Sequence, residues 1–176
     1  MMNNIINVYA AGVLFYGKSI DQTPYFLLGR DYENKWSNFG GRCELSDKSD
    51  PEITAAREAW EESLGAVYDF ETIKNTLKNK NIKCIISKTP SGRPYYMYMV
   101  KINFTTSYRD RFQSTKKFIS NLNFDDKFLE MNDIKWVSVD TIKYSIQNRK
   151  YFIKLRTVFE QSLIANLDEI LSYINT

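Results

Sequence analysis

One short predicted helix, over residues 51–65, constrains the fold of this chain more than any other feature. Asp50 and Pro51 are typical of a helix start, because an N-cap carboxylate accepts hydrogen bonds from the first amides and proline lacks the amide that a first turn leaves unused. At about 100° per residue the acidic and apolar side chains separate onto two faces. The acidic face holds Glu58, Glu61 and Glu62 beside Thr54, Ala55 and Gly65, and the apolar face holds Ile53, Ala56, Trp60 and Leu64.

The glutamates of this helix repel one another. Like charges at neighbouring helical positions cost roughly 0.2–0.5 kcal/mol per pair, so a counter-charge is expected nearby. A hard divalent cation suits this role, because Mg²⁺ binds carboxylate oxygens together with the phosphates of a substrate. The alternative is a solvated acidic face without a ligand, which is the commoner role of charge clusters.

The residues before and along this helix resemble a Nudix box. That pattern joins a glycine loop to a helix with arginine-glutamate, an apolar residue, any residue and two further glutamates. The matching residues are Gly40, Gly41, Arg57, Glu58, Ala59, Glu61 and Glu62, in a box spanning about 40–65. The resemblance implies an α/β/α sandwich with a mixed β-sheet, the Nudix loop-helix and a long C-terminal helix.

The box departs from the family pattern in its loop and at its end. The loop is two residues longer, and Ser49 occupies the position of the first glutamate. Asp47, Asp50 and Glu44 are each able to replace that carboxylate, and the sequence does not choose among them. The closing glycine, Gly65, comes one position late. These differences affect the ends of the helix more than its central charged run.

The rest of the chain supplies the strands and helices that such a fold needs. Apolar runs bounded by turn residues predict strands at 8–16, 25–30, 83–88, 95–104 and 134–139. Apolar residues at helical spacing predict a short helix or loop at 70–81 and one long helix from Lys150 to the C-terminus. No internal repeat or linker is visible, so residues 1–176 are expected to form a single domain.

Residue counts exclude several kinds of catalysis. The chain has no histidine, which removes imidazole-assisted serine or cysteine catalysis and histidine-ligated zinc. Cys43 and Cys84 are isolated in the sequence, so neither a disulfide framework nor a zinc site is indicated. Acid–base chemistry then falls mainly to carboxylates, lysine, tyrosine or metal-bound water. With no secretory start and no apolar run of membrane-spanning length, we expect a soluble cytoplasmic protein.

The resemblance also implies a metal site and a general base. The implied ligands of Mg²⁺ or Mn²⁺ are the Gly41 carbonyl, Glu58, Glu61 and Glu62. Arg57 is expected to orient a neighbouring carboxylate, and Glu58 and Glu130 are rival candidates for the base. Glu130 is chosen because family members often supply one more carboxylate just before a late strand. Asp126 and Asp133 are further candidates there, and a solvated acidic loop is the alternative.

Residues outside the box are candidates for binding the substrate. Arg30 ends a predicted strand, and it is either a phosphate contact or a solvated arginine. Trp36 and Phe39 precede the glycine pair, and they either stack on a base or, as aromatic residues beside a turn more often do, belong to the core. Arg93, in a turn rich in proline and glycine, is a weaker candidate for a phosphate contact.

The implied reaction is the divalent-metal-dependent hydrolysis of a pyrophosphate bond in a nucleoside diphosphate linked to another group. The alternative substrates are capped mRNA or another RNA 5′ end, and diphosphoinositol polyphosphates. An insertion at 108–123 interleaves aromatic residues with Arg109, Arg111, Lys116 and Lys117, as a polynucleotide surface or as a solvated helix face. A third interpretation, favoured by Ser49, is a catalytically silent Nudix scaffold that binds a nucleotide or a partner. The oligomeric state stays open.

Overall fold

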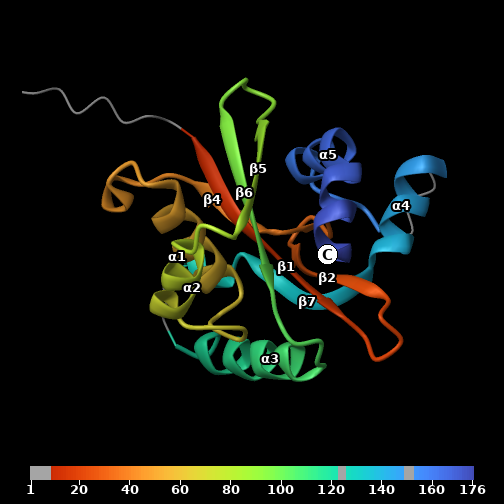
Figure 1. The fold of residues 1–176 in the computed structure, drawn as a ribbon. Helices are drawn as coiled ribbons and strands as arrows, with labels where there is room; N and C mark the ends of the chain where they lie inside the picture. Colours follow the sequence, from red (N-terminus) through yellow and green to blue (C-terminus); the bar gives the residue numbers. More distant parts are fainter. Residues whose placement is uncertain (1–8, 123–125, 149–152) are drawn as a thin grey trace, which may run out of the picture.

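The computed structural model describes residues 9–122, 126–148 and 153–176, which form one sheet with helices on both sides (Figure 1). The strands are β1 (Ala10–Lys18), β2 (Pro24–Asp31), β3 (Trp36–Ser37), β4 (Phe39–Arg42), β5 (Lys83–Lys88), β6 (Pro94–Lys101) and β7 (Met131–Ser138). The helices are α1 (Pro51–Glu62), α2 (Phe70–Leu77), α3 (Ser107–Ile119), α4 (Val139–Asn148) and α5 (Thr157–Asn175). Two 3-10 turns, η1 (Leu45–Asp47) and η2 (Asp126–Leu129), precede α1 and β7.

β1 is the centre of a mixed seven-stranded sheet. It runs parallel to β6 on one side. On its other side the second half of β1 pairs with β2 and the first half with β4, both antiparallel. The remaining pairs, β2 with β3 and β7 and β5 with β6, are also antiparallel. The sheet therefore forks between β2 and β4, and the glycine pair lies on the β4 branch.

The β4 branch lies unusually close to β1. Gly12 is directly opposite Gly40, and a Cβ built on Gly12 would lie 2.3 Å from the carbonyl oxygen of Phe39. A Cβ on Gly40 would lie 2.7 Å from the Cα of Gly12. Only glycine permits such an approach, so these small residues serve the packing of one backbone on another.

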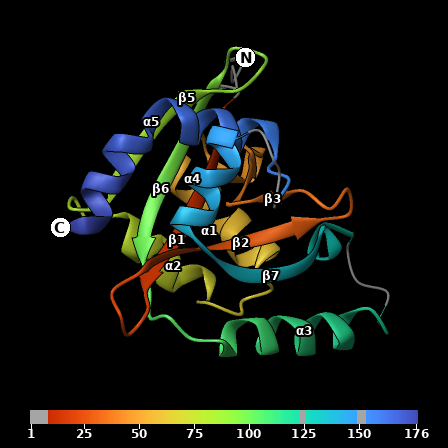
Figure 2. The ribbon, with the colours of Figure 1, turned by 90° about the vertical axis from the view of Figure 1, so that its right-hand side faces the viewer.

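Helices cover both faces of the sheet, as Figures 1 and 2 show. Along β1, Val13 and Phe15 belong to the core beneath α1, α2 and α3, whereas Leu14 and Tyr16 belong to the core beneath α4 and α5. This alternation is the two-residue period of a strand. The expected α/β/α sandwich with a mixed sheet is confirmed.

The C-terminal helix is shorter than predicted. It begins at Thr157 instead of Lys150, and residues 149–152 lie outside the described part. Its backbone leaves helical geometry at Asn166, where φ is −130°. The apolar spacing identified the buried face of this helix, but it did not locate its first residue.

The segment before α5 joins the sheet instead of the helix. Leu155 forms a parallel bridge to Trp36. The Trp36 amide donates to the Lys154 carbonyl at 2.7 Å, and the Arg156 amide donates to the Trp36 carbonyl at 2.9 Å. Because these backbone groups pair with β3, the chain cannot be helical here, and Arg156 is carried to the edge of the sheet.

Smaller differences concern the ends of other elements. β1 extends to Lys18, and its predicted first residue, Val8, lies outside the described part. β6 ends at Lys101 and not at 104. The predicted insertion contains α3, which packs beside the edge strand β7. No helix in the described ranges is long and apolar enough to cross a bilayer.

Candidate active site

The start of α1 matches the sequence prediction. Asp50 caps the helix, with its carboxylate accepting hydrogen bonds from the amides of Glu52 and Ile53, and Pro51 is the first helical residue. The buried face differs from the prediction, however. Thr54, Ala55, Ala56, Ala59, Glu61 and Glu62 are buried, whereas Ile53, Trp60 and Leu64 are only half-buried. The small alanines let α1 approach the sheet closely, and the glutamates turn inward because buried partners receive them.

Arg57 is the main partner of these carboxylates. Its Nη1 donates to Glu58 Oε1 at 2.9 Å and to Glu61 Oε2 at 3.2 Å. Its Nε and Nη2 each donate to Asp47 at 2.9 Å, and Nη2 also reaches the Arg42 carbonyl at 3.0 Å. Burial alone would lower the pKa of Arg57, but Asp47 and Glu58 raise it, so the guanidinium stays charged. One arginine thus fixes several acidic side chains in one place.

Asp47 is the carboxylate that meets Arg57 where the box lacks its first glutamate. It is 1% exposed and also accepts hydrogen bonds from the Thr54 hydroxyl and the Glu44 amide, each at 2.8 Å. Burial would raise the pKa of Asp47, but the hydrogen bonds from Arg57, Glu44 and Thr54 outweigh it and lower that pKa. Asp50 is occupied as the helix cap, and Glu44 is largely exposed, 3.5 Å from Arg57. Of the three candidates for this position, Asp47 therefore makes the buried bidentate contact.

The end of the box also has a geometric explanation. Leu64 and Gly65 both have left-handed backbones, with φ of 53° and 66°. The Gly65 amide donates back to the Trp60 carbonyl, which closes the last turn of the helix. Such a helix end favours glycine, and here the first left-handed position is held by a leucine instead.

Glu58 and Glu62 carry raised pKa values. Burial raises the pKa of Glu58 to about 7, with repulsion from Glu61 and Glu130 adding to it and Arg57 opposing it. Glu62 is almost fully buried, and its carboxylate accepts the Gly40 amide at 2.6 Å. Burial, then the nearby Glu58, raises the pKa of Glu62 well above the ordinary value. Both shifts therefore come mainly from burial of the carboxylates, and repulsion from neighbouring glutamates adds to it.

Gly41 lies directly against this cluster. A Cβ built on Gly41 would lie 2.5 Å from Glu58 Oε1. The carboxylate of Glu58 therefore rests against the bare backbone of the glycine, and any larger residue would displace it.

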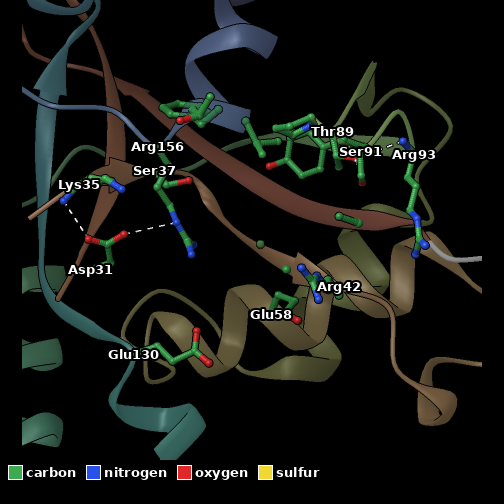
Figure 3. Close-up of a pocket in the computed structure, with 18 of the residues that line it drawn as sticks. Asp31, Lys35, Ser37, Arg42, Glu58, Thr89, Ser91, Arg93, Glu130 and Arg156 are labelled. Atoms are coloured by element: carbon green, nitrogen blue, oxygen red, sulfur yellow. Dashed lines mark hydrogen bonds and ion pairs between the residues drawn. The ribbon is translucent and has the colours of Figure 1, made fainter. Parts of the chain in front are cut away.

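A cleft of about 1300 Å³ opens above α1 (Figure 3). Its acidic side includes Glu58 and Glu130, and Glu44 lies at its rim. Four cationic side chains also line it: Lys35, Arg42, Arg93 and Arg156. Glu58 lies between Arg42 and Glu130 in the view of Figure 3, with Arg156 across the cavity and Arg93 at its far end. The cleft thus offers both carboxylates and cations to one ligand.

Arg156 is the cation that comes from the C-terminal segment. Its Nε lies 3.4 Å from Asp31, its ion-pair partner. Its charge also lowers the pKa of Glu62 in opposition to burial, so it acts on the cluster from across the cleft. No sequence pattern pointed to Arg156, Lys35 or Arg42, because only the fold brings them to the cleft.

Of the four candidates for binding the substrate, Arg93 lines this cleft, and Arg30, Trp36 and Phe39 do not. Phe39 is fully buried against Phe15, with ring centroids 5.7 Å apart. Trp36 is 7% exposed and lies 5.5 Å from the Arg30 guanidinium. The core interpretation therefore fits both aromatic residues, because Phe39 packs in the core beneath α1, α2 and α3 and Trp36 in the core beneath α4 and α5. Arg30 lies with Trp36 and not at the cleft.

The acidic group before β7 divides into two. Glu130, the candidate chosen from this group, lines the cleft together with Glu58. Asp133 instead accepts two hydrogen bonds from Arg109, at 2.9 and 2.7 Å, and does not line it. The side chain of Asp126 lies outside the described part of the structure.

The donor set suits a hard divalent cation in its chemistry. Glu58, Glu61 and Glu62 are oxygen ligands, and two of them have raised pKa values that a cation would relieve. As they stand, the carboxylates of the described residues form no group of three or more arranged around one metal position. Glu62 is turned to the Gly40 amide, and Arg57 holds Glu58 and Glu61.

Comparisons with known proteins show a likeness of fold. No protein-family model and no curated protein matches the sequence. The C-terminal domain of mouse MUTYH, in a complex with human PCNA, matches with a TM-score of 0.53 at 9% identity, over 93% of this chain and 90% of that one. A C. elegans Ap4A hydrolase binary complex matches with a TM-score of 0.49 at 14% identity, over 93% and 98%. The Nudix hydrolase RenU from M. smegmatis matches with a TM-score of 0.46 at 13% identity, over 93% and 86%.

Proposed function

We propose that this chain, which has a Nudix-like fold, hydrolyses the pyrophosphate bond of a nucleoside diphosphate linked to another group, with Mg²⁺ or Mn²⁺ as cofactor. The observation that carries the proposal is that Glu58 and Glu130 line the same cleft as Arg156 and three other cations. Pyrophosphate hydrolysis needs both kinds of group, because the phosphoryl oxygens must be neutralised while water is activated. A solvated acidic helix face would need neither.

The proposed metal ligands are Glu58, Glu61, Glu62 and the carbonyl of Gly41. A divalent ion bound there would neutralise charge on the phosphoryl oxygens and lower the pKa of a coordinated water. The raised pKa values of Glu58 and Glu62 support this assignment, because burial makes their charged forms costly and a bound cation would lower that cost. Glu62 would have to release the Gly40 amide to join the others.

The protein's own groups have separate roles in this proposal. Arg57 orients Glu58 and Glu61 through Nη1, and Asp47 holds Arg57 in turn. Glu58 or Glu130 removes the proton from the attacking water. A pKa of about 7 suits Glu58 to this task where it does not itself bind the metal, because a bound cation would lower that pKa; where Glu58 is a ligand, Glu130 is the base.

The cations of the cleft bind the phosphates. Arg156 and Lys35 approach from the side of β3, while Arg42 and Arg93 lie on the other side of Glu58 (Figure 3). A guanidinium matches two phosphate oxygens at once, so Arg156 is proposed to hold the phosphoryl group across from the carboxylates. The hydroxyls of Thr89 and Ser91, beside Arg93, are available to the group that is linked to the diphosphate.

The experiment that tests this function is a substrate panel with Mg²⁺ and with Mn²⁺. It contains nucleoside diphosphate derivatives, dinucleoside polyphosphates, diphosphoinositol polyphosphates and capped RNA, and it measures release of phosphate-containing products. We expect metal-dependent turnover of at least one nucleoside diphosphate derivative. Turnover confined to capped RNA would replace the substrate class, and no turnover of any member would overturn the proposal.

A catalytically silent scaffold is the second candidate. Two observations favour it: the described residues hold no ready cluster of three metal ligands, and the matched MUTYH domain was solved in a complex with PCNA. Tight nucleotide binding without turnover in the same panel would support this candidate. The RNA alternative is weakened at one residue of the insertion, because the charge of Arg109 is paired with Asp133.

A further inference from the structure

A row of side chains crosses three strands on the side of the sheet that faces α4 and α5. Trp36 on β3 is opposite Arg30 on β2, and Arg30 is opposite Asp133 on β7. Lys135 lies two residues beyond Asp133 and therefore on the same face. Its Nζ is 4.3 Å from the centroid of the Trp36 ring, and the Arg30 guanidinium is 5.5 Å from it. β2 and β7 run side by side with α3 below them in Figure 2.

Asp133, the carboxylate in this row, already has hydrogen-bond donors on α3. Asp133 accepts two hydrogen bonds from Arg109 and one from Gln113 at 2.9 Å. In the described part of the chain, Arg30 and Lys135 form no ion pair, and Arg30 Nε is buried without a hydrogen-bond partner. A buried donor of this kind costs free energy until it meets an acceptor.

A third cation, Lys116 of α3, lies against β7 next to this row. Lys116 Nζ donates to Asn132 Oδ1 at 2.9 Å and to the Met131 carbonyl, both of which are uncharged. Burial, followed by repulsion from Arg30, lowers the pKa of Lys116. Burial also lowers the pKa of Lys135, with Arg30 adding to the shift and Asp133 opposing it. Burial and the charge of Arg30 thus make the charged forms of Lys116 and Lys135 costly, and a bound anion would lower that cost.

We propose that Arg30, Lys116 and Lys135 form a second anion site, for a phosphate group. Phosphate suits it better than a carboxylate does, because a dianion with several acceptor oxygens can meet a guanidinium and two ammonium groups together. None of the three cations lines the cleft. The site borders the cleft at Tyr32, which lines the cavity and has Lys116 Nζ 5.3 Å from its ring centroid. The phosphate belongs either to a small polyphosphate or to a polynucleotide passing Tyr32.

The fluorescence of Trp36 can report on this site. The chain has three tryptophans, and Trp36 is the one in contact with both Arg30 and Lys135, so a bound phosphate should change its emission. The probes are inorganic tripolyphosphate and an RNA of about ten nucleotides with a 5′-hydroxyl, titrated in chelator without divalent ions. Trp36→Phe identifies the part of the signal that belongs to this residue. These conditions make the measurement independent of any turnover in the cleft.

The test compares two double variants with the same change in net charge. We expect Arg30→Gln with Lys135→Gln to weaken binding by about tenfold or more, because two charged contacts are lost. The matched control, Lys80→Gln with Lys101→Gln, alters exposed lysines outside the cleft and the site, and it should bind as the wild type does. If the first variant does not fold, Lys135→Gln alone should weaken binding at least threefold; among the described residues its ammonium contacts the Trp36 ring and forms no ion pair, so the fold should tolerate the change.

The two probes separate the sources of the phosphate. A change in Trp36 emission with tripolyphosphate but not RNA supports a small ligand. Tight RNA binding, with a salt dependence that becomes shallower by about 0.7 for each cation removed, supports a polynucleotide. The proposal is overturned if neither probe changes the emission of Trp36, or if the site variant and the control bind equally well.

Discussion

The carboxylate of Asp47 receives two hydrogen bonds from one guanidinium, from Nε and from Nη2 of Arg57, both at 2.9 Å. The 3-10 turn before α1 is thereby joined to the centre of that helix. Because Nη1 of the same arginine holds Glu58 and Glu61, the position of the turn and the position of the acidic cluster depend on one another.

Asp47→Asn is expected to lower the free energy of unfolding by about 3 kcal/mol, because it leaves a buried arginine without its closest charge partner. Turnover should fall as well, since Arg57 would no longer hold Glu58 in place. Urea unfolding followed by circular dichroism measures the first effect. Ser49→Ala, at the exposed position of the missing glutamate, is the control and should change stability by about 0.5 kcal/mol or less. Equal effects of the two substitutions would contradict the role given to Asp47.

Glu62→Gln is expected to reduce metal-dependent turnover by about a hundredfold or more while the protein stays folded. The glutamine keeps an oxygen acceptor for the Gly40 amide, and it removes a buried group whose pKa is raised. Initial rates at saturating Mg²⁺, with the unfolding transition as a check on folding, give the answer. Unchanged turnover would remove Glu62 from the proposed metal site.

Gly41→Ala should reduce activity with little effect on stability. The new Cβ would meet the mobile end of Glu58 at 2.5 Å, so Glu58 moves and turnover falls about tenfold or more. Gly12→Ala is the comparison, because its Cβ would meet backbone atoms at 2.3 Å and should destabilise the fold itself. Thermal unfolding and initial rates are measured for both. Loss of stability at Gly41 as large as at Gly12 would show that Glu58 cannot give way.

Arg156→Gln is expected to raise KM by about tenfold, because a charged contact to a phosphoryl group is lost. The fold should be little affected, since the backbone of Arg156, and not its side chain, pairs with β3. Arg111→Gln, on the exposed side of α3, is the control for the loss of one positive charge. A KM for Arg156→Gln that matches the control would mean that the substrate lies elsewhere in the cleft.

Asp133 gives the protein an acid-sensitive contact. Burial would raise the pKa of Asp133, but the hydrogen bonds from Arg109 and Gln113 lower it overall. Its stabilising effect is therefore present above the ordinary pKa of about 3.9 and is lost as the pH falls through the lower folded value. Asp133→Asn should cost about 1–3 kcal/mol of unfolding free energy at pH 7. The difference from the wild type should shrink below pH ~4, and a constant difference would exclude the ion pair as its source.

The sequence predicted what depends on local pattern. The cap at Asp50, the short helix after it, the central strands and the buried face of α5 follow from spacing and turn residues that neighbouring positions alone determine. The inward face of α1 was misjudged. Its glutamates were predicted to be exposed, because the hydrogen bonds they accept from Arg57 and from the Gly40 amide cannot be inferred from the sequence.

The candidate site was predictable to the extent that the box contains it. Glu58, from the box, and Glu130, from outside it, both line the cleft. Of its four cations, Arg93 was a weak candidate from the sequence, whereas Lys35, Arg42 and Arg156 were not candidates. In the sequence, Arg156 is indistinguishable from any charged residue near the start of a helix. It lies at the cleft because residues 154–156 pair with β3. Conversely, Trp36 and Phe39 are close to the glycine loop in sequence, but their side chains are buried in the two hydrophobic cores.

The hydrogen bonds between Trp36 and residues 154–156 have a consequence for biosynthesis. The acidic cluster of α1 precedes Arg156 in the chain, so it is translated first. While the chain emerges from the ribosome, β1, β2 and β4 can pair early through short connections, but the parallel partner β6 and the segment at 154–156 arrive later. The nascent protein therefore carries its carboxylates before it has all of the cations that complete the cleft.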